Sequence, residues 1–462
     1  MNCPLRRFKM RFVSSLVALT LAIVPTTSHA AQGKRNLPIV RDAEIESLIT
    51  DYVKPLLGAA GLSRSGIEVV LVNDTSFNAF VAGRRIFINL GTILDSESPN
   101  ATIGVLAHEI GHLAGGHQQQ LREQLERSQT IAIVAGLLGV GVAAAGAASG
   151  QSGIARAGAG LYSGGADFAH RLLLRYQRGE ETTADRAALT YLQKTKQSPK
   201  GLLDSFENLV RNRLFVGSSS DTYLSSHPLP QDRLTFLETA AKESPYYDKK
   251  DDPLLQQRHD FARAKIAAYT GGAIAVRRAF SREPYSFAAS YGDAIATHLG
   301  GSPSEALAKF DDLIRLDPQN PWLHEMRGEV LMEAGRANEA AAAYRKAASL
   351  DKSQSGIVQA EIGEALVTGG DPAKMQEAVE LIRKGLQSDP DNSIAYRFLA
   401  MAYGRIGDVG AAELATAEGY WRAGSFTEAK VFAARAQQKL KAGSPLWRQA
   451  QDIIETKTDK KD

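Results

Sequence analysis

Cysteine is almost absent from this chain of 462 residues, in which Cys3 is the single one. A lone cysteine forms no internal disulfide and offers no thiolate cluster to a metal ion. The chain also lacks a charge imbalance, because 54 basic and 51 acidic residues give a formal net charge of +3. Without a basic surplus there is no reason to expect nucleic acid as a partner. Apolar and charged contents of 44% and 23% are ordinary for globular domains.

Acidic residues are missing from the first 30 residues, which have the pattern of a secretory signal peptide. Its parts are a basic region with Arg6, Arg7, Lys9 and Arg11, an apolar stretch 12–24, and small residues at Ser28 and Ala30. This pattern predicts export and cleavage after Ala30. The alternative is a membrane anchor, for which the apolar stretch is short. Cleavage would remove Cys3 and leave a formal charge of about −1.

The most specific motif is His108-Glu109-Ile110-Gly111-His112, which has the form H-E-x-x-H inside an apolar helical pattern. Histidines four residues apart project from one face of an α-helix, so both imidazoles can bind one metal ion. The intervening glutamate can take a proton from a water molecule whose pKa zinc lowers to about 7. A chance match to this pattern somewhere in the chain has odds of order 1%. The alternative is a buried helix with two incidentally spaced histidines.

A catalytic zinc ion usually has three protein ligands. In the extended pattern H-E-x-x-H-x-x-G-x-x-H, Gly115 fits, but Gln118 stands where the third histidine should be. His117 is one residue short, which favours a capping or supporting role. The other option is Glu181, at the start of a later helix on which Asp185 shares its face and can orient a ligating histidine. An ordinary acidic first turn is the alternative, but the upstream motif favours the ligand interpretation.

Three segments resemble, in order, the motifs of the HtpX-like and CAAX-prenyl-protease-like zinc metallopeptidases. They are His108 to His112, Glu181 to Asp185, and Ser226 to Arg233 (SHPLPQDR). Within this family the chain is most similar to the periplasmic beta-barrel assembly-enhancing proteases, which carry helical repeats behind the peptidase. The resemblance covers nearly the whole mature chain. It implies that His108, His112 and Glu181 hold one Zn²⁺ ion and that Glu109 is the catalytic base.

The resemblance also implies that His227 lies close to the metal and takes part in catalysis or its control. In membrane-embedded relatives the matching histidine helps to stabilise the oxyanion. In the assembly-enhancing proteases its loop can cover the zinc and the histidine can occupy the water site. The alternative is a turn residue before Pro228. Arg233 is predicted to hold this loop through an ion pair, although a solvated arginine fits the sequence as well.

Residues 31–275 carry the peptidase motifs and are predicted to form one domain. An amphipathic helix is expected at 43–60, and strands at 67–72 and 85–89. Between the strands lies 78–81. By analogy with other zinc peptidases, a strand before the motif helix can border the cleft and receive a substrate peptide as an added strand. A plain core hairpin would have the same sequence pattern.

Residues 130–149 contain no charge and are rich in glycine and alanine. Their length permits a membrane span, but their modest hydrophobicity also suits a helix on a membrane surface or a partner, or a buried helical hairpin. The glycine-rich segment 150–165 lies between the two ligand motifs, where it can act as a lid.

Residues 276–456 show a repeat of 34 residues. Ala306, Phe310 and Leu313 recur as Ala340, Tyr344 and Ala347, and Pro284 recurs as Pro318; Ala378 and Pro390 fit a repeat stretched by four residues. A small residue, an aromatic four later and a proline after the second helix are typical of tetratricopeptide repeats, which stack into a protein-binding surface. Further helical pairs with turns at Gly404, Gly407 and Gly424 are expected, followed by a charged tail at 457–462. An ordinary helical domain is the alternative.

The sequence therefore predicts a mostly helical α+β protein: a zincin-type metallopeptidase domain with a small sheet, followed by an all-α tetratricopeptide-repeat solenoid. The predicted activity is that of an exported zinc endopeptidase. By resemblance, it acts in the periplasm on unfolded or misassembled outer-membrane proteins, with repeats that bind the substrate or the barrel-assembly machinery. The competing interpretation is a chaperone or assembly factor whose peptidase is plugged by His227. A binding scaffold with a dead site is disfavoured because the ligands and the base are all present.

Overall fold

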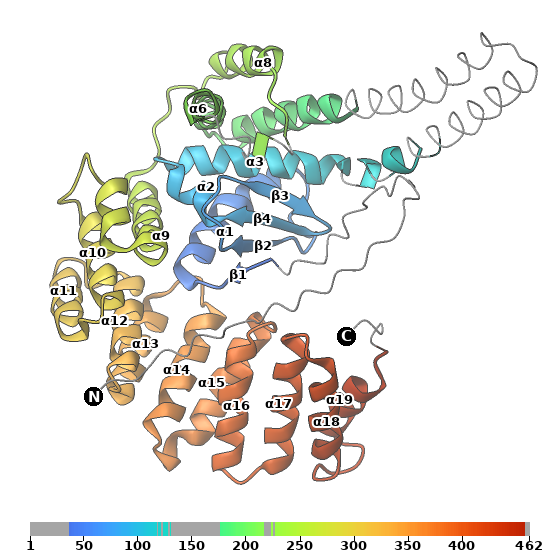
Figure 1. Cartoon of the computed structure of the whole chain (residues 1–462), viewed down its shortest axis with the longest axis vertical. Helices are drawn as coiled ribbons and strands as arrows, with labels where there is room; N and C mark the ends of the chain where they lie inside the picture. The colour runs from blue at the N-terminus through green and yellow to red at the C-terminus, as the bar shows by residue number, and fades with distance from the viewer. Residues whose placement is uncertain are drawn as a thin grey trace, which may run out of the picture. The chain divides into compact units, whose positions relative to one another are not determined.

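The computed structural model describes residues 37–117, 119–121, 123–127, 130, 176–216, 223–224 and 227–457 (Figure 1). The predictions for the signal peptide, for 131–149 and for the glycine-rich segment 150–165 fall outside these residues. The described residues from Pro38 onward belong to one compact unit. Within the described ranges, no helix combines the length and the apolar character that a membrane crossing needs.

A four-stranded sheet forms the floor of the peptidase part. Its strands are β1 (Ile39–Val40), β2 (Glu68–Val72), β3 (Ala79–Ala82) and β4 (Arg85–Asn89), in the order β1-β2-β4-β3. The predicted strands correspond to β2 and β4, which pair in parallel with Val70 opposite Phe87. The antiparallel hairpin places β3 at an edge of the sheet.

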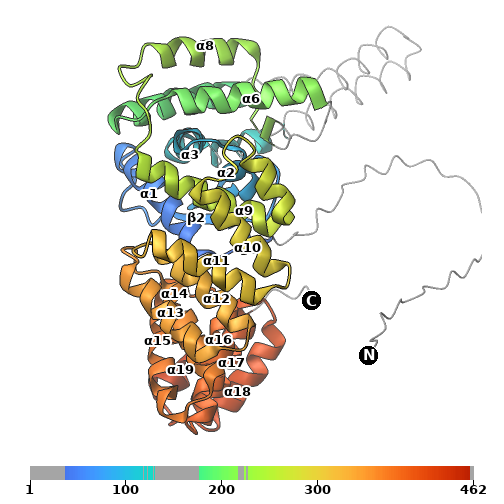
Figure 2. The same cartoon turned by 90° about the vertical axis from the view of Figure 1, so that its left-hand side faces the viewer.

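Helices surround this sheet, and α3 lies between the sheet and α6 (Figure 2). The bounds are α1 (Ala43–Ala59), α2 (Leu90–Asp95), α3 (Pro99–Gly115), α6 (Lys200–Val216), α8 (Gln231–Lys242) and α9 (Pro253–Ala279), with a further helix at 176–194. The predicted helix 43–60 is α1. One apolar core joins α1, the sheet, α3 and α6, so α3 is held from several sides.

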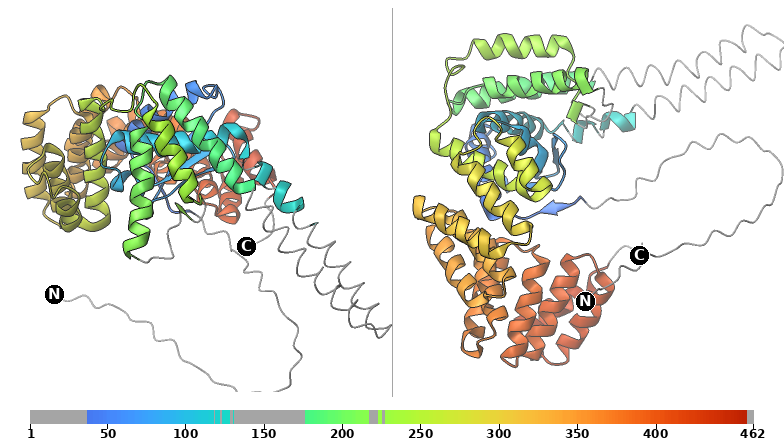
Figure 3. Two further views of the ribbon diagram at one scale, coloured as in Figure 1. Left: turned by 90° about the horizontal axis from the view of Figure 1, so that it is seen from above. Right: turned by 60° about the vertical axis from the view of Figure 1, so that its left-hand side comes forward.

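The second part of the chain is a series of antiparallel helices in which each packs on the next (Figure 3). They are α10 (Phe287–Leu299), α11 (Pro303–Leu316), α12 (Pro321–Glu333), α13 (Ala337–Leu350), α14 (Gly356–Gly369), α15 (Met375–Ser388), α16 (Ser393–Arg405), α17 (Val409–Arg422), α18 (Phe426–Gln437) and α19 (Pro445–Glu455), with a short 3-10 helix at Pro372–Lys374. The predicted fold class, a small-sheet peptidase followed by an all-α repeat array, is confirmed.

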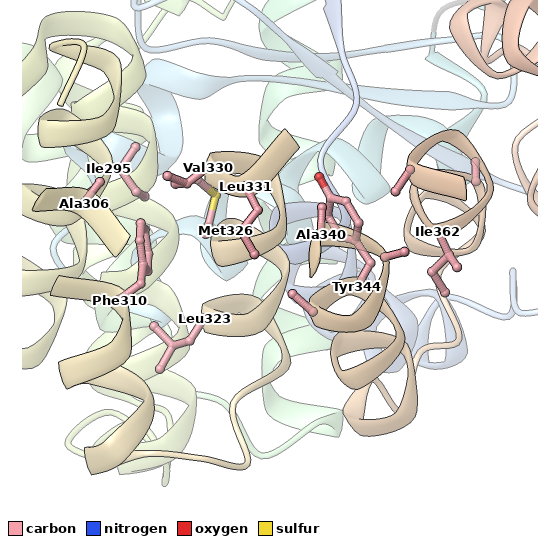
Figure 4. Close-up of a cluster of buried hydrophobic side chains, with 14 of the residues drawn as sticks. Ile295, Ala306, Phe310, Leu323, Met326, Val330, Leu331, Ala340, Tyr344 and Ile362 are labelled. Carbon is pink, nitrogen blue, oxygen red and sulfur yellow. The ribbon is translucent and has the colours of Figure 1, made fainter. Parts of the chain in front are cut away.

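The small and aromatic repeat positions form the contacts between successive helices (Figure 4). Ala306 and Phe310 on α11, and Ala340 and Tyr344 on α13, are all buried. A side chain at Gly328 on α12 would lie 2.7 Å from the Tyr344 ring, so a residue without a Cβ allows these two helices to approach. The 34-residue spacing therefore reflects packing.

One detail of the repeat prediction changes, and one predicted boundary falls inside a helix. Gly404 was expected in a turn but lies in the last turn of α16, whereas Gly407 and Gly424 have φ of 87° and 81° and occupy turns. The boundary expected near residue 275 falls inside α9, which continues to Ala279, and it lies close to the non-helical Gly272 at φ 61°. The domain limits stay predictions.

Candidate metal centre

The ends of α3 are fixed by local sequence. The Ser98 side chain accepts a hydrogen bond from the Ala101 amide, and Pro99 begins the helix. Gly116, in the left-handed region at φ 64°, ends it. The helix is buried along nearly its whole length, so His108 and Glu109 are 0% exposed. Because α3 is fixed at both ends and packed around, its side chains have little freedom to move.

The ligand atoms predicted from sequence converge on one point. Nε2 of His108 lies 3.1 Å from Nε2 of His112, and these atoms lie 3.3 and 3.4 Å from the two carboxylate oxygens of Glu181. Ligand atoms about 2.0–2.2 Å from a tetrahedral ion are about 3.3–3.6 Å apart, so the two distances to Glu181 match a zinc-sized ion and the distance between the imidazoles is slightly shorter.

Glu181 reaches this point because two helices approach very closely. A side chain at Gly111, on α3, would lie 2.8 Å from the carbonyl oxygen of Ala184 on the helix 176–194. The glycine between the two motif histidines therefore has a packing role that the H-E-x-x-H pattern does not reveal.

Asp185 and Arg233 support the ligands from behind. The Asp185 carboxylate lies 2.9 Å from Nδ1 of His108 and accepts hydrogen bonds of 2.5 and 2.8 Å from the Arg233 guanidinium. Arg233 also lies 2.7 Å from Glu181 and donates to the Pro228 carbonyl at 3.0 Å. A carboxylate behind a ligating imidazole fixes its tautomer and ring orientation. Arg233 thus contacts a candidate ligand, its supporting carboxylate and the His227 loop.

His227 lies inside the cluster. Its Nδ1 is 3.0 Å from Glu181 and its Nε2 is 3.6 Å from Glu109. One ligand atom from each of His108, His112, Glu181 and His227 lies within 4.8 Å of the others. The His227 ring stacks on Tyr223 at 4.6 Å between centroids. We call these four residues the metal cluster.

Glu109 is a buried carboxylate with no ordinary partner. Neither of its oxygens has a hydrogen-bond partner among the described residues, and its side chain is 0% exposed. Burial raises the pKa of Glu109. A buried carboxylate without donors is costly unless a cation or water completes its surroundings. The unpartnered Glu109 carboxylate lies beside His108, His112 and Glu181, whose side-chain atoms have the spacing of metal ligands, and this arrangement supports a metal ion at this place.

His117 extends the site on the far side of His112. The two Nδ1 atoms lie 2.9 Å apart, and His117 Nε2 lies 2.7 Å from Glu180. A side chain at Gly115 would lie 2.1 Å from the His117 ring, so glycine is needed for His117 to fold back. If His112 uses Nε2 as a ligand, its Nδ1–H donates to Nδ1 of His117, whose Nε2 then carries the proton on the side that faces Glu180. Gln118, the alternative ligand position, is outside the described residues.

Without a metal ion, the ionisable side chains of the metal cluster have pKa values shifted in different directions. Burial lowers the pKa of His108, but Asp185 and Glu181 outweigh it and raise this pKa to about 9. Burial lowers the pKa of His112 to about 3. Burial raises the pKa of Glu181, but contacts with His108, His112 and His227 lower it overall. A divalent cation would take the place of the His108 proton and keep the ligating imidazoles neutral.

Tyr223 and Glu180 were not identified from the sequence. Glu180 directly precedes Glu181, and adjacent acidic residues give no sign of which one faces a histidine. Tyr223 lies four residues before His227, whose amide donates to its carbonyl at 2.7 Å. That helical spacing was the available signal for Tyr223.

Comparison with known proteins gives the site a family. Residues 41–241 match the family model "Peptidase family M48". The chain is 23% identical over 426 residues to "Beta-barrel assembly-enhancing protease" of Escherichia coli (strain K12), covering 90% of this chain and 83% of the relative. It is 32% identical over 225 residues to "Metalloprotease YcaL" of Escherichia coli (strain K12), covering 47% of this chain and 80% of the relative.

Solved structures match the repeats at low similarity. An example is "Crystal structure of YrrB: a TPR protein with an unusual peptide-binding site", at TM-score 0.30 and 16% identity, covering 38% of this chain and 91% of that chain. A TM-score of this size supports no conclusion. The family model and the sequence relatives support a conclusion. The chain belongs to peptidase family M48 and is a metalloprotease.

Proposed function

We propose that this metalloprotease is a zinc endopeptidase in which His108, His112 and Glu181 hold the ion and Glu109 is the catalytic base. The observation that carries the proposal is the spacing of 3.1–3.4 Å between the two imidazole Nε2 atoms and from each of them to a carboxylate oxygen of Glu181, beside a buried carboxylate without partners among the described residues. Two imidazoles and a carboxylate suit zinc among the common divalent ions.

The chain's own residues supply the remaining chemistry. A bound zinc ion would lower the pKa of a coordinated water to about 7 and polarise the peptide carbonyl. Glu109, on the same helix as the two histidines, takes the proton of the attacking water and passes it to the leaving amine. Burial raises the pKa of Glu109, which makes its carboxylate a stronger base for this proton transfer. Asp185 keeps His108 oriented throughout.

His227 is the proposed control element. Its Nδ1 lies at 3.0 Å from Glu181, inside the cluster, which supports a closed state with His227 in the position that a water would need. The loop is held there by Arg233 through the Pro228 carbonyl. Opening then requires this segment to move, after which His227 can donate to the oxyanion.

The proposed substrates are misfolded or misassembled outer-membrane proteins. Support comes from the similarity, over 83% of its length, to a protein named for enhancing beta-barrel assembly. The repeats are proposed to bind such substrates or the barrel-assembly machinery, since stacked helical pairs present an extended protein-binding surface. The proposed location is the periplasm, reached by a signal peptide cleaved after Ala30. Contact of 130–149 with a membrane surface stays a prediction.

A second candidate function is that of a chaperone or assembly factor whose peptidase is mostly latent. The observation that favours it is His227 inside the metal cluster. The two functions differ in what happens when proteolysis is removed, because an assembly role survives Glu109→Gln whereas degradation does not.

The test is degradation of an unfolded outer-membrane protein by the purified mature chain. Wild type, Glu109→Gln and His227→Ala are compared, with zinc content determined on each. Glu123→Gln is the matched control, because it makes the same substitution at an exposed glutamate. We expect wild type to cut, Glu109→Gln to lose about 10²–10⁴-fold in rate while keeping its zinc, and Glu123→Gln to match wild type.

The His227→Ala variant separates its two roles. Faster cleavage would show that His227 blocks the metal, whereas slower cleavage would show that it serves the transition state. If no variant cuts and none binds metal, the peptidase proposal fails. If Glu109→Gln still supports assembly of outer-membrane proteins in cells, the assembly function stands beside it.

A further inference from the structure

We propose a second divalent-metal site in the repeats, formed by His298, Glu329 and Glu333. His298 lies in the last turn of α10. Glu329 and Glu333 lie on α12, four residues apart and thus on one face of that helix. One ligand atom from each of the three lies within 4.8 Å of the other two. The site is separate from the metal cluster and does not depend on the proposed function.

The His298 imidazole is buried without a hydrogen-bond partner. Its side chain is 1% exposed, and neither ring nitrogen has a partner in hydrogen-bonding geometry among the described residues. Its Nε2 is directed at two carboxylates, 3.4 Å from Glu333 and 3.7 Å from Glu329. Buried polar groups are nearly always satisfied, so an unsatisfied imidazole facing two carboxylates indicates a missing partner.

The distances from His298 to the two carboxylates are longer than those of a direct hydrogen bond. A charge-assisted N–H···O hydrogen bond is about 2.7–2.9 Å long. A buried imidazole hydrogen bond in this chain, between His259 Nε2 and the Ser96 carbonyl, is 2.7 Å long. Contacts between the candidate zinc ligands are longer, at 3.3 and 3.4 Å from the imidazoles to Glu181. The His298 contacts belong with this longer group.

Neighbouring residues hold one of the two carboxylates in place, and the other carboxylate is open to solvent. The Tyr269 hydroxyl, on α9, donates to Glu329 at 2.5 Å, which limits rotation of that carboxylate. The Glu333 side chain is 66% exposed, so the site opens to solvent and water can complete the coordination. One imidazole and two carboxylates suit zinc or a similar divalent transition metal. The ion would join α10 to α12 beside α9.

The experiment counts metal on the full mature chain. Wild type, Glu333→Gln, His112→Ala and the control Glu339→Gln are equilibrated with Zn²⁺ alone, and bound zinc per chain is measured by mass spectrometry. Glu339 is a matched control because it is exposed to a similar degree, 54%, but pairs with Arg336 and no histidine. Co²⁺ titration of the same proteins, followed by absorption, reports each site's coordination.

We expect two zinc ions in wild type and Glu339→Gln, and one in His112→Ala. In Glu333→Gln the site formed by His298, Glu329 and Glu333 should lose at least tenfold in zinc affinity. Glu333 is exposed, so its loss leaves the fold intact. A Co²⁺ spectrum that persists in His112→Ala and disappears with Glu333→Gln would support the site.

The proposal is overturned if Glu333→Gln titrates as wild type does, or if His112→Ala binds no metal. Either result would mean that a protonated His298 simply pairs with two glutamates. If wild type binds a single zinc ion that is kept in His112→Ala and lost in Glu333→Gln, this site is supported and the proposed catalytic ligands are contradicted, so the two proposals fail independently.

Discussion

Two buried clusters of ionisable side chains in this protein each contain three carboxyl groups and one cationic group, but their excess negative charge is neutralised in different ways. Around the metal cluster, the carboxyl groups of Glu109, Glu181 and Asp185 face one guanidinium, that of Arg233. In the second group, which we call the Lys265 cluster, three carboxyl groups face one ammonium. Its members are Lys265, Asp42, Glu44 and Glu325, with the Lys265 ammonium at 2.7, 3.5 and 3.2 Å from the respective carboxylates. Both groups therefore have an excess of negative charge.

The Lys265 cluster balances its excess with protons. Burial raises the pKa of Glu44 to about 7 and that of Glu325 to about 8, against the opposing effect of Lys265. In the metal cluster the carboxylate of Glu181 has a lowered pKa, because imidazoles surround it. Buried negative charge alone thus does not indicate a metal ion. Imidazole and carboxylate atoms at ligand spacing do, and this criterion separates the two groups.

The largest effect should follow from Lys265→Met. Removing the one cation leaves three carboxyl groups buried together, which typically costs about 3–5 kcal/mol when a partner of a buried pair is lost. Denaturant unfolding of the zinc-loaded protein measures the free energy of unfolding. Lys242→Met is the control, since that lysine pairs with Glu238 on the surface at 57% exposure and its loss should change the free energy of unfolding far less. Equal losses in the two variants would show that the Lys265 cluster has no special electrostatic role.

A smaller effect is expected from Asp185→Asn in the metal cluster. The amide keeps the shape but weakens the contact with His108 and with Arg233, and loss of such a supporting carboxylate lowers metal affinity by about 10–100-fold. Competition with a chelator measures the zinc affinity. Asp232→Asn, on the exposed first turn of α8, should leave that affinity within about twofold. An unchanged affinity in Asp185→Asn would show that Asp185 does not orient the ligand.

The two clusters also differ in how far their contacts could be predicted from the sequence. The approach of His108 to His112 was predictable because helical periodicity alone brings residues four apart to one face. The parallel pairing of β2 with β4 and the repeat packing of Phe310 and Tyr344 follow from equally short-range patterns. Glu181 needed a second motif, since no local rule links residues about 70 apart.

The Lys265 cluster was not predictable. Its members come from the start of α1, the middle of α9 and α12, and none of the intervals between 42, 265 and 325 has a structural meaning in sequence. Tyr269 and Glu329 meet for the same reason, through packing of α9 on the repeats. Buried charge pairs of this kind depend on the tertiary arrangement, which spacing does not encode.

The pH dependence of stability should show the protons in the Lys265 cluster. Glu325 has a folded pKa of about 8, above its ordinary 4.5, so the folded state holds a proton that the unfolded state releases. Its stabilising effect is complete below about pH 4.5 and is lost as pH rises through about 8. Between pH 5.5 and 8.5 we expect wild type to lose roughly 1–3 kcal/mol relative to Glu325→Gln, which mimics the protonated form.

Denaturant unfolding across this range, with zinc saturating, measures the difference between the two proteins. Taking a difference cancels the other titrating groups. Glu339→Gln, at an exposed glutamate on α13 outside both proposed metal sites, is the control and should follow wild type above pH 6. A constant difference between wild type and Glu325→Gln would mean that Glu325 is ionised throughout.

The smallest effect is expected from Asp42→Asn, which separates two roles of one side chain. Asp42 caps α1 by accepting from the Ile45 amide at 2.8 Å, and it also pairs with Lys265. Asparagine is as good a cap, so only the charge is removed. Because Glu44 and Glu325 hold protons that they can release, they can restore the balance around Lys265, and the loss should stay below about 1 kcal/mol at pH 7. The same change should move the pH dependence to lower pH, since one repelling carboxylate is gone. A loss as large as that of Lys265→Met would show that the cluster is a fixed ion pair rather than a set of groups that exchange protons.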